Sequence, residues 1–439
     1  MSARATPASA LLSSDTPAGQ LGADLQGIAW GLAPISREDY RLQRMHQYYA
    51  LEMRREPSIY IGEDLGQPQE VDPLYEAVYM NRGYSCTVQH FQLRHLIWSP
   101  DPAHVYFTCT SQALAAAMAR SNLANMTDVA MAIGWLDGST VALWNPTSNH
   151  EHKCFGIRDV CGAHSKISTI CATADLLLVG GFYGELVVQK VHDYAHYHPL
   201  LERGAAERRP PTVVKRITHD DNGITNLIVP FHHTSPEKFL LSSNDAHIRI
   251  YDALSHKIIP LYRRTSAVNA AKVSPCGRML AVATDSRELE IFDLRSDTLV
   301  QRLAGHVGFT FSCDWHCDGR LLATGNEDHS TRIYDVRGRT DAALYALGSR
   351  MAPVRNVLFS PEGSVLAVME ESDFVIFYDV ASGFDRCSTL DFFGETSGIS
   401  FTPDGDYGYV GCGDAQRGGI IELRRPMAPT LYRLEQLIL

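Results

Sequence analysis

The sequence predicts an all-β fold, a propeller of seven four-stranded blades behind a partly helical, partly disordered N-terminal extension. Three observations predict it: a short phrase recurs every forty-odd residues, a polar turn containing glycine precedes it, and the intervening runs are short and apolar. Periods of about 40–45 residues with four strands each are typical of propeller blades. We expect the propeller to cover residues 83–439 of the 439-residue chain.

The recurring phrase closes the third strand of each repeat. It reads IRIYD at Asp252, LEIFD at Asp293, TRIYD at Asp335 and VIFYD at Asp379, at intervals of 41, 42 and 44 residues. The similar phrase VALWN ends at Asn145, and the sequence does not assign it to the first or the second blade. A blade has two apolar faces that it cannot cover alone, so the repeats must stack against one another.

A polar turn joins the first two strands of the later repeats. The turns lie within VSPCGRMLAVAT, WHCDGRLLATGN, FSPEGSVLAVME and FTPDGDYGYVGC, and the glycine in each predicts a tight hairpin. The runs that follow are apolar instead of strictly alternating, which indicates strands buried on both sides.

Seven repeats can be counted, and six or eight remain alternatives. The first opens at His90, and we expect TDVAMAIGWL (residues 127–136) to be its outer strand. The seventh ends in GGIIELRR. Just before the first repeat, YSCTVQHF is expected to supply the outer strand that the seventh lacks and so close the ring.

Three segments lie outside the regular repeat. Residues 1–33 are expected to be disordered, and residues 34–82 form a partly helical extension, with a helix from Glu38 to the neighbourhood of Pro57. Its apolar side would gather Tyr40, Met45, Tyr48 and Tyr49. Residues 192–217 are basic and rich in proline at their end, which predicts a projecting loop between the second and third blades.

Composition excludes several classes of protein. A net charge of −11 argues against general affinity for nucleic acid, which depends on lysine and arginine. No apolar run approaches the roughly 18 residues needed to span a bilayer, and the N-terminus lacks the apolar core of a secretory signal. The ten cysteines are scattered without paired CxxC motifs, which is typical of a reduced protein. We therefore expect a cytoplasmic or nuclear protein that binds neither membrane nor nucleic acid.

The stretch ATGNEDHSTRIYD (Ala323–Asp335) places Asp, His and Ser side by side, as an active site or a structural turn would. No GxSxG, HExxH or phosphate-binding glycine motif accompanies it, so we expect neither an enzyme nor a cofactor. In SCDWHC, Cys313, His316 and Cys317 could in principle approach a metal, but the strand alternation turns His316 away from the cysteines. The histidines of HDYAHYH (residues 192–198) are expected to be solvated, and no metal site is predicted.

This stretch resembles the WD-repeat family. The matching residues, in chain order, are Gly305-His306, Thr324, Asp328 and Tyr334-Asp335. The resemblance implies a buried network in which the aspartate, the histidine and the threonine hydroxyl tie the turn to the strand, which leaves Ser330 without a catalytic base. The third repeat keeps an aspartate, Asp245, in the equivalent turn.

Several other stretches are similar to a family of uncharacterised WD-repeat proteins of plants and fungi. These are ISREDYRLQRMHQYY, VQHFQLRHLIW, LLLVGGFYGEL and DFFGETSGISFTPD. That resemblance implies no assigned activity. We therefore predict a non-catalytic scaffold for protein or peptide partners. An enzyme with a site at the centre of the ring is a less favoured alternative, because no motif in the sequence marks such a site.

Two phrases suggest an alternative function. FDLR, ending at Arg295, and YDVR, ending at Arg337, resemble the WDxR signature of substrate receptors of cullin-RING ubiquitin ligases. There the arginine pairs with acceptors on a ligase adaptor, for which a guanidinium is better suited than an ammonium. The competing interpretation is that Arg295 and Arg337 bond within their own blades.

Overall fold

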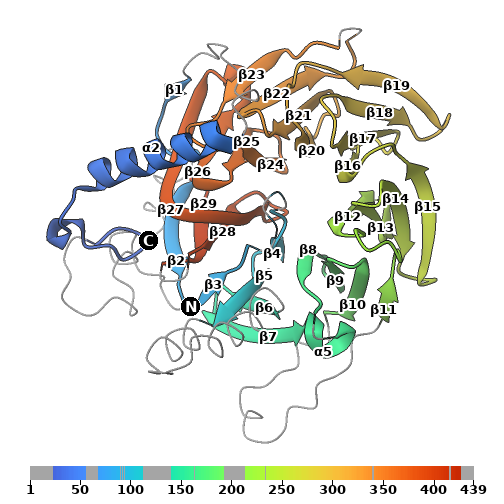
Figure 1. The fold of residues 1–439 in the computed structure, drawn as a ribbon, viewed down its shortest axis with the longest axis horizontal. Helices are drawn as coiled ribbons and strands as arrows, with labels where there is room; N and C mark the ends of the chain where they lie inside the picture. The colour runs from blue at the N-terminus through green and yellow to red at the C-terminus, as the bar shows by residue number, and fades with distance from the viewer. Residues whose placement is uncertain are drawn as a thin grey trace, which may run out of the picture.

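Seven antiparallel blades surround a common axis in the computed structural model of the chain (Figure 1). The structure describes residues 23–55, 68–88, 90, 92, 94–111, 140–162, 164–191, 213–232, 234–338, 341–414 and 417–426. Within these residues the propeller predicted from the repeat is confirmed, as is its count of seven blades.

The first three blades run through residue 263, with the innermost strand given first. The first blade is β4 (Ile97–Asp101), β5 (His104–Ser111), β6 (Thr140–Asn145) and β7 (His150–Gly156), with β3 (Tyr84–Cys86) also pairing with β5. The second is β8 (Ile167–Ala172), β9 (Leu176–Gly181), β10 (Glu185–Lys190) and β11 (Val213–Arg216), and a short helix, α5 (Ile157–Cys161), precedes it. The third is β12 (Thr225–His232), β13 (Ser235–Ser243), β14 (His247–Asp252) and β15 (Lys257–Arg263).

The next two blades are the most regular. The fourth is β16 (Val268–Val273), β17 (Met279–Thr284), β18 (Leu289–Asp293) and β19 (Thr298–Leu303). The fifth is β20 (Thr310–Trp315), β21 (Leu321–Asn326), β22 (Ser330–Asp335) and β23 (Tyr345–Gly348). Apolar side chains of neighbouring blades share one core, as Leu240, Leu280 and Leu322 do in the third to fifth blades.

The last two blades share a long strand, β27 (Arg386–Phe401). The sixth blade is β24 (Val354–Phe359), β25 (Val365–Glu370), β26 (Ser372–Asp379) and the first part of β27. The seventh is the second part of β27, β28 (Tyr407–Gly413), β29 (Gly419–Arg424) and β2 (Glu76–Asn81). A two-residue strand, β1 (Gln69–Glu70), adds to the outer edge of the sixth blade in parallel with β27.

The predicted hairpin glycines explain why the first two strands of each later blade turn back so sharply. Gly277, Gly319, Gly363 and Gly405 have φ values of 71°, 66°, 80° and 75°. Each glycine donates its backbone N–H to the carbonyl three residues earlier, as in the 2.8 Å bond from Gly363 to Ser360. A left-handed backbone at these positions favours glycine, which has no Cβ to clash.

The strand that closes the ring differs from the prediction. The outer strand of the seventh blade is β2, which lies antiparallel to β29 from Glu76 to Asn81, and not YSCTVQHF. Part of YSCTVQHF is β3, which pairs with β5 of the first blade. The reason is burial: Met80 enters the core shared by the last blades, and the chain reverses before β3.

The first blade also corrects the sequence assignment. VALWN is β6, the third strand of this blade, and its Trp144 is completely buried. The outer position is occupied by β7, which pairs with β6. TDVAMAIGWL, which we expected there, lies outside the described residues.

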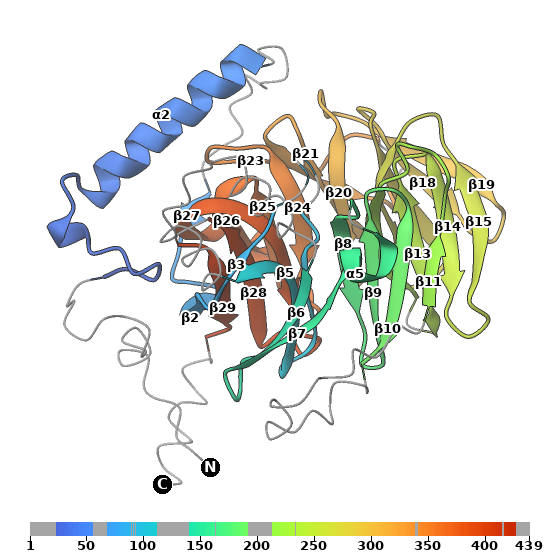
Figure 2. The same cartoon turned by 60° about the horizontal axis from the view of Figure 1, so that its bottom comes forward.

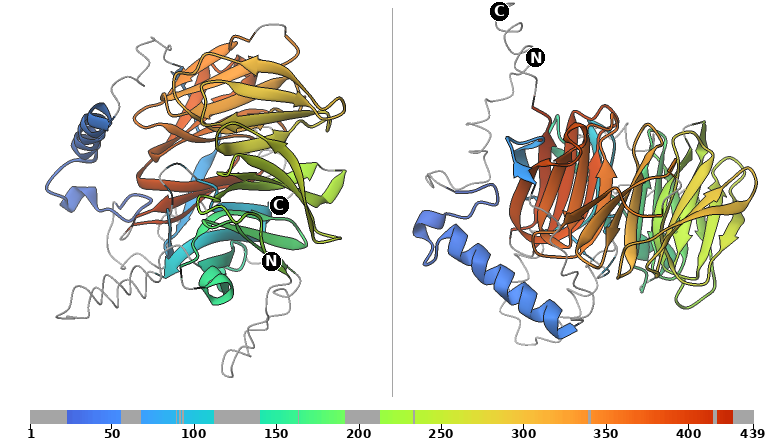
Figure 3. Two further views of the ribbon diagram at one scale, coloured as in Figure 1. Left: turned by 45° about the vertical axis from the view of Figure 1, so that its right-hand side comes forward. Right: turned by 90° about the horizontal axis from the view of Figure 1, so that it is seen from above.

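The N-terminal extension packs beside the last blades. Residues 23–33 fell within the segment expected to be disordered, but they form a bridge between Ala23 and Ala29 and a 3-10 helix, η1 (Trp30–Leu32). Buried Gln26 anchors them, because its side-chain amide donates to the Phe393 carbonyl at 2.7 Å. The predicted helix is present as α2 (Arg37–Arg55), which lies outside the ring next to β26–β29 (Figures 2 and 3).

Candidate functional site

The two ends of the ring carry different candidate residues. Because neighbouring strands run antiparallel, the β9–β10 and β25–β26 turns share one end of the ring with the β19–β20 connection. Helix α2 docks there, and we call it the helix end. The β18–β19 and β22–β23 turns lie at the opposite end, which we call the rim end.

At the helix end of the fifth blade, the structure brings together the residues of the predicted network. Nδ1 of His306 lies 2.9 Å from the Asp328 carboxylate, and Nε2 lies 2.7 Å from the Thr324 hydroxyl. Asp328 also accepts from the backbone N–H of Val307 at 3.0 Å and of Ser330 at 3.1 Å. Both His306 and Asp328 are buried. A buried carboxylate needs such partners, and a satisfied network stiffens the turn.

The same geometry leaves Ser330 unsuited to nucleophilic attack. Its hydroxyl donates to Asp328 at 2.6 Å, while both ring nitrogens of His306 already face Asp328 and Thr324. Burial lowers the pKa of His306, although Asp328 acts in the opposite direction. A serine nucleophile requires a free base and an approach for substrate, and this buried site offers neither.

Two further residues of the predicted network use other partners. The Tyr334 hydroxyl donates to the Ala304 carbonyl at 3.0 Å, on the connection that enters the blade. In the third blade, the two terminal nitrogens of Arg249 donate to the two carboxylate oxygens of Asp245, at 3.0 and 2.6 Å. Burial opposes the charge of Asp245, but the bonds from Arg249 outweigh it and lower its pKa to about 2. An arginine thus supplies in one blade what a histidine supplies in the other.

The rim arginines lie where the sequence placed them, at the third-strand turns of the fourth and fifth blades. Both side chains are exposed at the rim end. Arg337 donates to the Asp318 carbonyl of its own blade at 2.9 Å. The backbone N–H of Arg295 donates to Asp293 at 2.8 Å, which fixes the turn, and the residue is exposed. The Arg337 guanidinium is therefore already bonded within its own blade, and Arg295 is the more available of the two for binding a partner.

A cluster that sequence reasoning missed holds α2 on the helix end; we call it the helix latch (Arg37, Arg41, Arg44, Asp373, Asp391, Phe393). Arg41 bonds to both Asp373 and Asp391 and donates to the Phe392 carbonyl at 2.5 Å. Arg44 donates two hydrogen bonds of 2.7 Å to the Asp373 carboxylate. The Asp373 side chain is completely buried, so these cations provide its compensation.

Aromatic rings complete the helix latch. The Arg41 guanidinium carbon lies 4.2 Å from the Phe393 ring centroid and 4.5 Å from that of Phe374. Tyr40 and Trp30 also pack on Phe393, at centroid distances of 5.0 and 5.4 Å. The expected aromatic side of the helix is thus only partly correct, because Tyr49 is 49% exposed and the docking face is built on arginines. The available signal was the pair of arginines three residues apart in RLQR.

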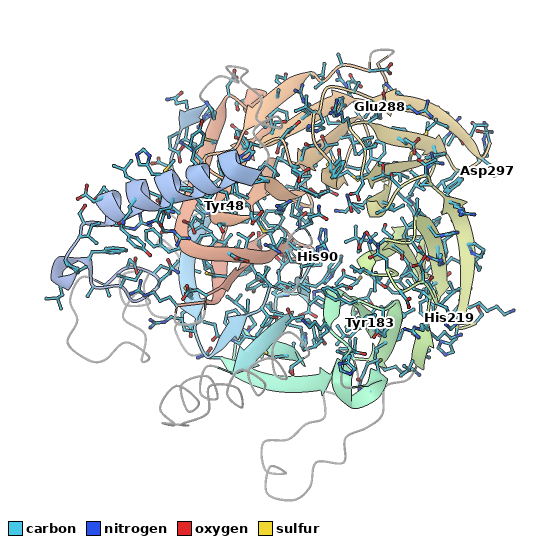
Figure 4. All side chains as sticks on the ribbon, viewed as in Figure 1. Tyr48, His90, Tyr183, His219, Glu288 and Asp297 are labelled. Carbon is cyan, nitrogen blue, oxygen red and sulfur yellow. The ribbon has the colours of Figure 1, made fainter. Side chains whose placement is uncertain are left out.

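A second missed cluster lies near the axis at the helix end; we call it the central charge cluster (His90, Arg94, Arg355, Glu371, Glu395). Arg355 bonds to one oxygen of Glu371, with Nε at 2.9 Å, and its guanidinium carbon lies 4.4 Å from the Phe311 ring centroid. Arg94 lies 3.5 Å from Glu395 and also donates to the His90 carbonyl. Figure 4 shows His90 at the centre of the ring and Tyr48 on α2.

Burial and like charges perturb this cluster. Burial lowers the pKa of His90 to about 4, and Arg94 and Arg355 lower it further. Burial also lowers the pKa of Arg94 to about 10, with Glu371 opposing and Arg355 adding to the effect. With these pKa values Arg94 remains charged at neutral pH, and His90 remains neutral.

The described residues were expected to hold no metal, and their side chains are arranged as follows. Among the described residues, no three His, Cys, Asp or Glu side chains converge as a metal site would require. Cys313 is buried and Cys317 is exposed, in keeping with strand packing, while the histidines of HDYAHYH lie outside the described residues. In the same part of the chain, no helix is long and apolar enough to cross a membrane.

Known proteins are similar to this chain in one repeat and in the overall fold. The family described as "WD domain, G-beta repeat" matches residues 297–335, the segment that holds the fifth-blade network. A chain of the crystal structure of a mitotic checkpoint complex aligns with a TM-score of 0.59 and 13% identity, over 83% of this chain and 98% of that chain. At this identity the likeness concerns the fold alone.

Curated relatives are similar over a quarter to a third of the chain. The meiotic recombination protein rec14 of Schizosaccharomyces pombe is 27% identical over 111 residues, which are 25% of this chain and 36% of rec14. The target of rapamycin complex subunit wat1 of the same yeast is 28% identical over 145 residues, 32% of this chain and 45% of wat1. The GATOR2 complex protein Wdr24 of Drosophila melanogaster is 27% identical over 126 residues, 28% of this chain and 16% of Wdr24. The matches therefore span less than half of each relative, and two of these relatives are named as components of complexes.

Proposed function

Because the chain is an all-β WD40-repeat propeller, we propose that it is a non-catalytic scaffold that holds protein or peptide partners on the helix end of its ring. The supporting observation is a set of exposed apolar side chains at that end. Val307 and Phe309, on the β19–β20 connection, are 37% and 40% exposed, and Tyr183, on the β9–β10 turn, is 41% exposed. Aromatic residues are enriched where proteins bind proteins, and rigid blades hold them at little entropic cost.

The polar residues of the helix end support the same proposal. His306, Asp328 and Ser330 are committed to one another in the fifth blade, and Asp373 is committed to α2. Groups that serve the architecture in this way are not available for acid–base chemistry. The surface that remains for function is the one presented by the loops.

Affinity capture with the intact protein tests the proposal. Phe309→Ser together with Val307→Ser should remove the partners that the unaltered protein retains. Val300→Ser is the matched control, because Val300 is 50% exposed on β19, an outer strand away from that end. If the double variant keeps every partner, or the control loses them equally, the helix end is not the binding face.

A second candidate function is that of a substrate receptor for a cullin-RING ligase, favoured by the exposure of Arg295 and Arg337 at the same end of neighbouring blades. It predicts stable capture of the ligase adaptor, lost in Arg295→Ala with Arg337→Ala. Arg287→Ala, an exposed arginine on the β17–β18 turn, should leave capture unchanged. Because the two functions use opposite ends of the ring, the two sets of variants separate them.

Two narrower features belong to the same proposal. The N-terminal motif ISREDYRLQRMHQYY, which includes the latch arginines, supports membership in the uncharacterised WD-repeat group of plants and fungi. The scattered cysteines and acidic charge support a cytoplasmic or nuclear location. Imaging of a tagged full-length chain would test the location directly.

A further inference from the structure

The central charge cluster brings two buried guanidinium groups, those of Arg94 and Arg355, close enough to repel each other. The Arg94 and Arg355 side chains are 1% and 7% exposed. Of their carboxylate partners, Glu371 is 14% exposed, whereas Glu395 is 53% exposed and reaches the cluster from the surface. Glu371 is thus the less exposed of the two carboxylates that pair with these guanidinium groups in the described part of the chain. Charges removed from water require close compensation, so a second anion at this place is favoured.

The bonding of Arg355 shows where a second anion would fit. Its Nε and one terminal nitrogen both donate to the same oxygen of Glu371. The other terminal nitrogen, Nη1, is buried and has no hydrogen-bond partner within the described part of the chain. A guanidinium offers five N–H donors in a fixed fork, and a carboxylate beside Nη1 would use donors that are otherwise unmatched.

Glu395 occupies the neighbouring position only loosely. Its carboxylate lies 3.5 Å from Arg94, at the limit of a hydrogen bond, and more than half of its side chain is exposed to water. At 3.5 Å the bond from Arg94 is at the limit of hydrogen-bond length, so another carboxylate that comes closer to Arg94 can replace Glu395. Glu395 therefore acts as a removable stand-in for a ligand.

Apolar surface lies next to the cluster along the chain. Phe311, which stacks under Arg355, is two residues after the exposed Phe309 and four after the exposed Val307. Val307 and Phe309 lie on the β19–β20 connection, at the same end of the ring as the central charge cluster. A peptide can place an acidic side chain in the cluster and an apolar one on Phe309 simultaneously, which a free inorganic anion cannot do.

We propose that the central charge cluster binds an acidic side chain of a partner peptide, which displaces Glu395 from Arg94 and bonds to Arg355 Nη1. This inference rests on the proposed scaffold function and names the chemistry of its partner: an acidic segment with an adjacent apolar residue. Specificity comes from the paired guanidiniums, and the surface Glu395 excludes weaker anions by competition.

Fluorescence anisotropy with fluorescein-labelled hexaglutamate and the full-length chain tests the proposal. Arg355→Met removes a charge that bonds to the peptide and should weaken binding roughly five- to tenfold. Glu395→Gln removes the carboxylate that competes with the peptide for Arg94 and should strengthen binding about fivefold. Arg287→Met removes an exposed arginine from the helix end of the fourth blade, away from the cluster, and its affinity should stay within about twofold of the unaltered protein. Arg355→Lys keeps the charge but not the fork, and should fall between Arg355→Met and the unaltered protein.

Several outcomes would overturn the proposal. Equal weakening by Arg355→Met and Arg287→Met would show general attraction to positive charge, and unchanged affinity in Glu395→Gln would remove the displacement step. Inorganic phosphate that competes with hexaglutamate at equal concentration would show a site for free anions instead of peptides. If Arg355→Met unfolds, as melting would reveal, Glu395→Gln and Arg355→Lys decide the result. Failure here leaves the scaffold proposal intact, because that proposal is tested by capture through Val307 and Phe309.

Discussion

Replacing Asp328 tests whether the Asp, His and Ser of the fifth blade are architecture. The carboxylate accepts four hydrogen bonds: from His306, from the Ser330 hydroxyl, and from the backbone of Val307 and Ser330. At about 1 kcal/mol for each bond, Asp328→Ala should cost about 4 kcal/mol. Breaking a buried charged network costs about 3–5 kcal/mol, which agrees. Asp328→Asn keeps one acceptor oxygen and should cost about 1–2 kcal/mol, because it leaves fewer groups unmatched.

Thermal unfolding and amide hydrogen exchange measure this effect. At about 2 °C for each kcal/mol in a large domain, Asp328→Ala should lower Tm by roughly 8 °C. Exchange at the amides of Val307 and Ser330 should accelerate more than elsewhere, since local opening releases these two groups. Asp221→Ala, at an exposed turn position, should leave Tm unchanged. A Tm for Asp328→Ala equal to that of Asp221→Ala would refute the structural interpretation and return this cluster to the candidates for chemistry.

Three further predictions concern the turns, the helix latch and the central charge cluster. Gly363→Ala should destabilise the sixth blade, because its φ is 80° and an added Cβ would clash with the side chains of His316 and Cys317 in the fifth blade; an unchanged Tm would contradict this. Arg41→Ala should raise the rate of tryptic cleavage in α2 about tenfold, as expected for roughly 1.4 kcal/mol lost from the docked state. The pKa of His329 is lowered to about 4, by burial first and by Arg355 second, so Arg355→Met should raise its midpoint in a nuclear magnetic resonance titration. Because the pKa of His329 is lower in the folded chain, the unfolded chain binds a proton there below about pH 6.5 and the folded chain does not. The free energy of unfolding therefore decreases as the pH falls from 6.5 toward 4. A His329 midpoint near 6.5 in the folded protein would contradict both the lowered pKa and this loss of stability.

The sequence indicated the blades because each needs the same local signals within a short stretch. Gly319 and the phrase ending at Asp335 are separated by 16 residues, so turn and strand can be read together. The closure by β2 was misplaced because its partner β29 begins more than 300 residues later, and no repeat phrase marks β2. The helix latch was missed for the same reason, because its two halves lie far apart in the sequence. Arg41 looks like an ordinary solvated residue of a polar helix until Asp373, 332 positions away, is brought beside it.

The turn between the second and third strands explains why one blade shows the family signature and its neighbours do not. At this turn a residue with positive φ recurs, namely Gly184, Ala246, His329 and Asp373 in the second, third, fifth and sixth blades. Each turn has buried polar groups that must be satisfied, but the residue that satisfies them changes.

In the second blade, Glu185 accepts from the Ser165 hydroxyl and the Tyr183 N–H, both at 2.7 Å. In the sixth, Glu370 accepts from three backbone N–H groups, and burial raises its pKa to about 7. Because Glu370 satisfies its own blade, Asp373 is free to receive Arg41 and Arg44 from outside it. The sixth blade therefore satisfies its turn with Glu370 and uses Asp373 as the anchor of α2, whereas the fifth blade uses Asp328 to satisfy its own turn.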